Sequence, residues 1–407
     1  ACEAQCREAL AAREQACGPT AEATLAAASD LAAAALRVGK QDEAERLFRR
    51  ALEACEQGFG SSHPNTVASL GNLGNCLLAI GRLGEAEDLH RRALLACDAA
   101  SFHPSHPSRM AALDNLAQCV AERGSDLENA RRLAREVWEA KVGAFGAKHP
   151  EALASKAVLA GLLARLGDAE EADLLYCETI AERERVLGEE HPDTLATINN
   201  RAFLLRTVGR FVEAEAQHRL AYEGLKRTRG AQHPEALLSL DNVAWAAGAQ
   251  GRRSEAEALS STACEGLRRA LGPEHPCTLA ALCNRAQHLE ALQRLREAEE
   301  LHRRTLKGLQ RALGPEDQQV LACMGSLSAL LFRQGGSMAR VTEAEKLARR
   351  QLAGLKKLVG PGHPEAMAVA GHLAGILRWS NRHHEAEQTL REACAAGAAR
   401  LGEDHPE

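Results

Sequence analysis

The sequence predicts an all-α solenoid, in which antiparallel helix pairs stack in about nine repeats of 42 residues. Three observations predict this fold. The dipeptide His-Pro recurs at intervals of 42 or 43 residues, Glu-Ala-Glu or a near relative follows most of these His residues by 22 residues, and apolar residues within each repeat have helical spacing. A fixed period of this length is typical of repeat proteins, and two phrases in the same phase make chance recurrence implausible.

The His-Pro phrase places the repeats along the chain. It begins at His63, His106, His149, His191, His233, His275, His363 and His405. One interval spans 88 residues and holds a further repeat, in which Asp317-Gln318 replaces His-Pro. Four extra residues of that repeat lie near Gly335, Gly336, Ser337 and Met338, where we expect a longer turn.

Repeat starts are therefore predicted near residues 21, 63, 106, 149, 191, 233, 275, 317 and 363. Residues 1–20 match the second half of a repeat, and residues 405–407 open another one. We expect residues 1–407 to form a single array, cut at both ends from a longer one. The repeat from residue 106 is irregular, with one extra residue near Ser125.

Each repeat contains two amphipathic patterns, which the repeat from His191 illustrates. Pro192 suits the first helical position because its ring presets φ, and His191 is then the cap or pre-cap residue. Apolar residues spaced by three or four follow, at Leu195, Ile198, Ala202 and Leu205. The pattern ends at Gly209-Arg210.

A second helix is predicted from Phe211 to Gly230. Its apolar face carries Phe211, Ala214, Ala221 and Leu225, with charged residues on the other face. Neither helix can bury its stripe alone, so the repeats depend on stacking. Small residues such as Ala202 and Ala214 are expected where the two helices approach closely.

Composition excludes several functional classes. The net charge is −5, and acidic and basic residues alternate in salt-bridging faces, so no nucleic-acid partner is predicted. We find no apolar run long enough to cross a membrane and no signal-peptide pattern. The 13 cysteines include no CxxC pair and act as small hydrophobes, as expected in an intracellular, reducing compartment such as the cytoplasm.

The repeat from His191 resembles the 42-residue tetratricopeptide variant of kinesin light chains. The resemblance lies in the opening phrase His191–Ala202 and in the turn and second-helix start Gly209–Glu215, and its repetition covers essentially the whole chain. It implies a right-handed superhelix, whose first helices line a concave groove that binds peptides or other proteins.

In that family the groove carries an Asn on the first helix that hydrogen-bonds a peptide backbone. The matching position lies nine residues after the repeat's His and holds Asn72, Asn115, Asn200, Asn242 and Asn284. An amide offers a donor and an acceptor to a peptide bond. Alternatively, these amides bond to the neighbouring repeat and fix the stacking. Further groove positions hold Phe203, Arg206, Trp245 and Arg378, of which the Arg residues suit an acidic partner.

No catalytic, cofactor or metal site is predicted. The periodic His residues begin separate helix pairs and cannot converge on one ion, while His90, His218 and His302 share a second-helix phase expected to be packed in the core. His383 and His384 lack an HExxH pattern, and no GxSxG or phosphate-binding loop occurs.

The sequence favours a scaffold that binds a peptide or a partner helix in its groove, not an enzyme. Two alternatives stay open. In the first, the chain would be a structural subunit of a large assembly. In the second, it would be the regulatory region of an enzyme whose catalytic domain lies elsewhere. RNA binding is the weakest alternative, because the chain lacks positive charge and interleaved aromatic residues.

Overall fold

The computed structural model describes residues 2–18, 20–38, 40–124 and 126–401. Gly39, Ser125 and the His405-Pro406 phrase lie outside the described residues. The regular structure of the described ranges is entirely α-helical, which confirms the predicted fold class. The chain divides into two compact units, Ala1–Gly188 (unit 1) and Glu189–Glu407 (unit 2), and each is described by itself.

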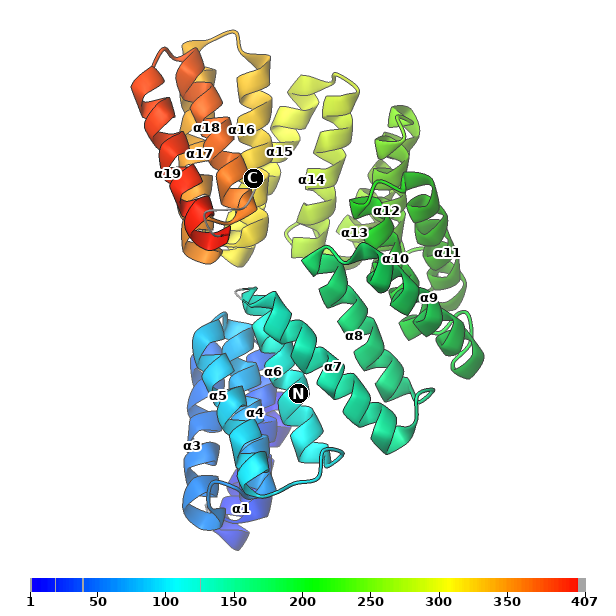
Figure 1. The fold of residues 1–407 in the computed structure, drawn as a ribbon, viewed down its shortest axis with the longest axis vertical. Coiled ribbons are helices and arrows are strands. Elements are labelled where there is room, and N and C mark those ends of the chain that lie inside the picture. The colour runs from blue at the N-terminus through cyan, green and yellow to red at the C-terminus, as the bar shows by residue number, and fades with distance from the viewer. Residues whose placement is uncertain (1, 19, 39, 125, 402–407) are drawn as a thin grey trace. The chain divides into compact units, whose positions relative to one another are not determined.

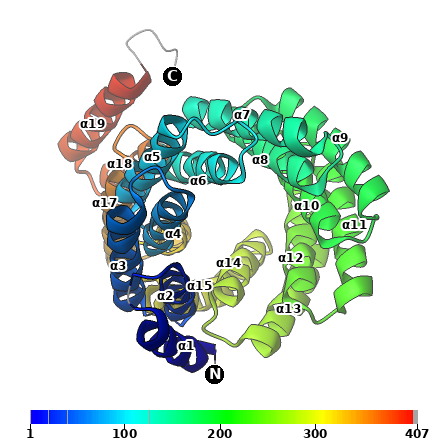
Figure 2. The ribbon, with the colours of Figure 1, turned by 90° about the horizontal axis from the view of Figure 1, so that it is seen from below.

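Unit 1 is a series of antiparallel helices that pack against their neighbours in the chain (Figure 1). It contains α1 (Cys2–Cys17), α2 (Glu22–Arg37), α3 (Gln41–Phe59), α4 (Pro64–Ile80), α5 (Leu83–Ala99), α6 (Pro107–Arg123), α7 (Leu127–Phe145), α8 (Pro150–Leu166) and α9 (Ala169–Val186). The even-numbered helices begin at the predicted repeat starts. In Figure 2, α4 and α6 lie inside α3, α5 and α7.

Unit 2 repeats the same arrangement. It contains α10 (Pro192–Thr207), α11 (Phe211–Arg229), α12 (Pro234–Ala249), α13 (Arg253–Leu271), α14 (Pro276–Ala291), α15 (Leu295–Leu313), α16 (Gln318–Gln334), α17 (Met338–Leu358), α18 (Pro364–Trp379) and α19 (His383–Leu401). Among these, α12 also contacts α14, α14 contacts α16 and α16 contacts α18, and Figure 2 shows α10 and α12 inside α11 and α13. The even-numbered helices therefore form the inner face of the unit.

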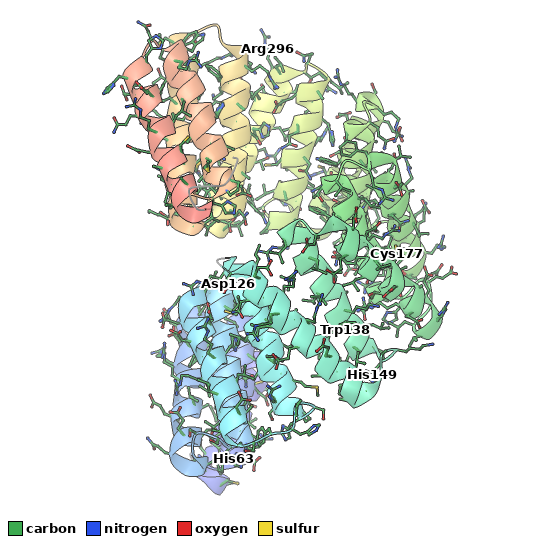
Figure 3. The ribbon with its side chains drawn as sticks, viewed as in Figure 1. His63, Asp126, Trp138, His149, Cys177 and Arg296 are labelled. Carbon is green, nitrogen blue, oxygen red and sulfur yellow. The ribbon has the colours of Figure 1, made fainter. Side chains whose placement is uncertain are left out.

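The periodic His residues are N-caps, as the sequence predicts. In each described His-Pro phrase the His side chain accepts a hydrogen bond from the backbone N–H two residues later, and Pro occupies the first turn. Figure 3 labels two of these caps, His63 and His149, in the loops that lead into α4 and α8. Asp317 replaces the imidazole with a carboxylate that accepts from Gln319 N at 2.8 Å. The lost His-Pro phrase thus still leaves a capped helix.

The core consists mainly of Ala and Leu. Ala202 and Ala214 have exposed fractions of 0%, as do their counterparts Ala244 and Ala256, so these small residues are indeed buried as expected. Gly74 permits the closest approach, because a Cβ atom there would lie 2.4 Å from the ring of His90. His90, His218 and His302 are fully buried, which confirms the prediction that they are core residues.

Several turns inside the helix pairs of the described ranges contain a residue in the left-handed conformation. Gly81, Gly209 and Gly251 adopt φ of 80–89° there. The equivalent Gln293 and Asn381 adopt φ of 61° and 57°, a conformation that a residue with a Cβ atom occupies at a cost.

The four-residue insertion is a turn only in part, which corrects the expectation of a longer turn. Gly335 and Gly336 have positive φ, and Ser337 caps α17 by accepting from Arg340 N at 3.4 Å. Met338 already belongs to α17, which has 21 residues where most second helices have 19. The rest of the insertion therefore lengthens the helix.

Ion pairs that involve residues of the second helices link successive repeats. Arg82 bonds Glu45 at 2.8 Å and Arg123 bonds Glu87 at 2.7 Å, across separations of 37 and 36 residues. In unit 2, Arg219 bonds Glu255 at 2.7 Å. The Arg and Glu residues thus form salt-bridging faces, as predicted, but many of the bonds run between repeats as well as along one helix.

Candidate peptide-binding face

Three of the predicted groove residues line one cavity on the inner face of unit 2. Asn200 and Phe203 come from α10, and Asn242 comes from α12. The cavity measures about 300 Å³, and its wall also contains Pro192, Ala196, Asn199, Leu225, Glu235, Leu238 and Ser239. The floor is largely apolar, and the two amides lie one repeat apart in equivalent positions. Such a mixture of an apolar floor and a few placed polar groups is typical of binding sites.

Arg206 stacks on Phe203, which lines this cavity, and its guanidinium contacts two aromatic rings. Its guanidinium carbon lies 3.7 Å from the ring centroid of Phe203 and 4.3 Å from that of Trp245. Phe211 meets Trp245 edge to face at 6.0 Å and supports the stack from behind. Burial lowers the pKa of Arg206, but a guanidinium stays charged at neutral pH. Within the described ranges, no carboxylate forms an ion pair with Arg206.

We call Asn200, Phe203, Arg206, Asn242 and Trp245 the α10–α12 face. Phe203 has an exposed fraction of 48%, and Asn200 is also exposed, whereas the other three residues are half-buried. The face therefore offers two amides, an apolar surface and one cation to the surroundings.

The remaining predicted groove residues lie elsewhere. Asn284 donates to Asp241 at 2.7 Å, so this amide bonds to the preceding repeat, as the alternative interpretation expects. Asn115 packs on the preceding repeat, with its Nδ2 atom 3.3 Å from where a Cβ of Gly71 would be. Asn72 is exposed and lines a separate cavity of about 270 Å³ with Asp30 and Phe59 in unit 1. Arg378 is exposed on α18.

Comparison with protein-family models identifies the family to which the chain belongs. Tetratricopeptide repeat models match residues 1–57, 42–99, 66–141, 151–227 and 193–269, and a second model of the same description matches 278–319, 320–365 and 367–407. The chain belongs to the tetratricopeptide repeat family. Proteins built from these repeats generally mediate protein–protein interactions. No curated protein matches the chain.

Solved structures resemble the tetratricopeptide array to different extents. A putative kinesin light chain from Podosopora anserina with nearly identical TPR-like repeats is 26% identical over 50% of this chain and 96% of its own, with a TM-score of 0.46. BtubC (BKLC) from P. vanneervenii is 20% identical over 59% and 94%, with a TM-score of 0.49. The apo form of RapI is 10% identical over 93% and 99%, with a TM-score of 0.58, and shares the fold.

A buried polar junction behind the α10–α12 face was missed in the sequence. His218 Nδ1 bonds Asn199 Oδ1 at 2.9 Å, and Asn199 donates to Ser239 of the next repeat at 2.8 Å. Asn199 lies eight residues after the repeat's His, and His218 lies 27 residues after it. Ser239 lies six residues after the His of the following repeat. We call this set the junction triad of a tetratricopeptide repeat.

In the next repeat the same three positions hold Asp241, Ser260 and Ala281, so this junction contains a buried acid. Asp241 accepts from Ser260 at 2.8 Å as well as from Asn284. Burial raises the pKa of Asp241 to about 6, against the effect of these two bonds. The sequence shows that His90, His218 and His302 share one position in their repeats. It does not show that they face the residues one position before the predicted Asn residues.

The junction triad from His275 is Cys283, His302 and Cys323. One ligand atom from each lies within 4.8 Å of the others. The hydrogen bond with Cys283, aided by His302 and opposed by burial, lowers the pKa of Cys323 to about 6, and the same bond raises the pKa of Cys283. The sequence gives no indication of this cluster, because its residues come from three separate helices and do not form a metal-binding motif.

No helix of the described ranges is both long and apolar enough to span a bilayer.

Proposed function

We propose that the α10–α12 face binds an extended peptide segment of another protein, with an acidic side chain of that segment against Arg206. The observation that carries the proposal is the position of Arg206, a half-buried cation that stacks on Trp245 and on Phe203, a residue of the cavity lining. The rings fix the guanidinium while leaving its N–H donors without a carboxylate within the described ranges. A carboxylate from a partner would supply a charge-assisted, bidentate bond.

The two amides supply the second element of recognition. Asn200 and Asn242 lie one repeat apart on the wall of the same cavity, so each can bond a different peptide unit of one extended segment. The apolar lining residues Phe203, Leu225 and Leu238 would pack against an apolar side chain. The array is thus proposed to act as an interaction scaffold, and no group of this face is proposed to take part in catalysis.

Selection from a library of displayed random peptides tests the proposal. We expect the intact array to enrich sequences with an Asp or Glu at one fixed position, and replacing that residue by Asn or Gln to weaken binding at least about tenfold. The variant Asn200→Ala, Asn242→Ala, Arg206→Glu should lose these peptides. Asn72→Ala, at the equivalent position of unit 1, is the matched control and should retain them.

A charge reversal separates specific contact from general damage. Arg206→Glu alone should bind peptides in which Lys replaces the selected acid better than the wild type does. Equal affinities of the wild type and the triple variant, with unchanged circular dichroism, would show that the peptides use another surface.

A further inference from the structure

The three side chains of the Cys283 junction triad come from three successive helices. Cys283 lies on α14, His302 on α15 and Cys323 on α16, and their ligand atoms are mutually within 4.8 Å. His302 and Cys323 are buried, and Cys283 is partly exposed. Two thiols and an imidazole held this close are the ligand types that bind thiophilic metal ions.

The hydrogen bonds of His302 leave one ring nitrogen for such an ion. Its Nε2 bonds Glu290 Oε1 at 2.9 Å, and Arg333 contacts the other carboxylate oxygen of Glu290. Its Nδ1 is fully buried and has no hydrogen-bond partner within the described ranges. A carboxylate that fixes one nitrogen of an imidazole while the other binds the metal is a recurrent arrangement in metal sites.

The equivalent triad of the repeat from His191 shows what is unusual here. There, the Asn199 amide bonds His218 through its Oδ1 atom and donates to Ser239 through its Nδ2 atom, so it joins the two side chains in a hydrogen-bonded chain. In the Cys283 triad, two thiols replace the amide and the hydroxyl. A thiol is a weak hydrogen-bond partner, so the buried imidazole has two soft ligands beside it where His218 has an amide and a hydroxyl.

We propose that Cys283, His302 and Cys323 bind one thiophilic d10 metal ion, zinc(II) or copper(I), through the two Sγ atoms and Nδ1. Two thiolates and a neutral imidazole balance the charge of zinc(II), which favours it in a buried site. Tetrahedral zinc would bring the sulfur atoms to about 3.7 Å of each other, so small side-chain rotations from the present separations suffice. Its fourth position would go to water or an external ligand from the partly exposed side of Cys283.

Such an ion would fasten two repeats together. The α14–α15 pair belongs to the repeat from His275, whereas α16 opens the repeat that has Asp317 in place of His-Pro. An ion that binds the folded array and not the unfolded chain stabilises the folded state by mass action. The junction between these repeats should therefore become more resistant to unfolding when the metal is bound.

The ion can be tested on the intact chain, stripped with a chelator and kept reduced. Cobalt(II) should bind one equivalent and give the sulfur-to-cobalt charge-transfer and tetrahedral ligand-field absorption bands of thiolate ligation. Zinc(II) should displace it and raise the thermal midpoint by about 5 °C. A parallel copper(I) titration against a chromophoric copper(I) chelator identifies the preferred ion.

Variants assign the ligands without removing the fold. Cys283→Ala and Cys323→Ala are tolerated by the geometry, because Ala157 and Ala281 occupy the equivalent positions in other repeats, and His302→Phe has Phe48 as its counterpart. Each should weaken binding of cobalt(II), zinc(II) and copper(I) at least about 100-fold while the metal-free chain keeps its circular dichroism spectrum, and the buried-thiol control Cys119→Ala should bind like the wild type.

Two results would overturn the proposal. One is the absence of stoichiometric binding of both zinc(II) and copper(I) to the reduced chain, in which case the triad is a hydrogen-bonded junction only. The other is binding that survives both Cys283→Ala and Cys323→Ala, which would place the metal elsewhere.

Discussion

Replacing Asp241 by Asn is expected to stabilise unit 2 at neutral pH. The Asp241 carboxylate has an exposed fraction of 3% and accepts hydrogen bonds from Ser260 and Asn284. An Asn at this position can keep both contacts, by accepting from Asn284 and donating to the Ser260 hydroxyl. Asn199, at the same position of the preceding repeat, likewise uses both ends of its amide, because its Oδ1 bonds His218 and its Nδ2 donates to Ser239. The substitution therefore removes a buried charge without leaving a polar group unpaired.

The magnitude follows from the pKa of Asp241. Burial raises it from the ordinary aspartate value of 3.8 to about 6. Between these values the folded state holds more protons than the unfolded chain, so stability falls as the pH rises through this window. A change of one in a pKa corresponds to about 1.4 kcal/mol, so the full cost above pH 6 is about 3 kcal/mol. Because other groups relax around the charge, we expect Asp241→Asn to gain about 1–3 kcal/mol at pH 7.

Urea denaturation followed by circular dichroism at several pH values between 4 and 7 measures this gain. The difference between variant and wild type should be near zero at pH 4 and should grow to its full size above pH 6. Asp88→Asn, a change of an exposed carboxylate on α5, is the control and should alter stability by less than about 0.5 kcal/mol at every pH. A variant that is no more stable than the wild type at pH 7, or a gain that does not depend on pH, would refute the reasoning.

Three further substitutions test the packing, the turns and the ion pairs. Ala214→Leu should overpack the α10–α11 pair and cost about 1–3 kcal/mol in a urea melt, and an unchanged midpoint would contradict the assigned register. Gln293→Gly should raise stability by about 1 kcal/mol because the left-handed φ of 61° suits Gly, whereas a lower thermal midpoint would show that the Gln side chain contributes more than its strain costs. Glu215→Ala should cost about 1–2 kcal/mol by calorimetry, since Glu215 bonds Arg219 at 2.8 Å and also contacts Arg252, and a neutral result would mean that water replaces these bonds without loss.

The helix pairs could be predicted from sequence because the features that define them are local. A His-Pro phrase starts a helix through its own cap and its own ring, and the burial of Ala202 and Ala214 follows from helical spacing within one repeat. The Asp317 cap is equally local, because its carboxylate accepts the backbone hydrogen bond that the imidazole accepts in the other repeats. The insertion was harder, because whether Met338 continues a turn or begins a helix depends on the packing of α17.

The candidate site could be predicted only in part. One residue along a helix turns a side chain by about 100°, so neighbouring positions face different partners. Asn200 and Asn242 reach the inner face of unit 2, whereas Asn199 and Asp241, one residue earlier, turn toward the second helix and the next repeat. The phase of the Asn positions gives no indication that Asn284 bonds Asp241, because that bond depends on an acid 43 residues away in the sequence. The peptide-binding role of the face is still a prediction.

The junction triads make the array a series of joints that differ in chemistry. With nearest-neighbour coupling, an array separates first where its weakest interface lies. In unit 1, both ring nitrogens of His90 are buried without a hydrogen-bond partner within the described ranges, while the joint at Asp241 contains a carboxylate that gains a charge as the pH rises past about 6. Acidic pH would therefore weaken the joint at His90, because burial lowers the pKa of this imidazole to about 4, whereas neutral pH would weaken the joint at Asp241. Repeats that are similar in sequence would therefore unfold in an order set by the buried polar groups at their junctions.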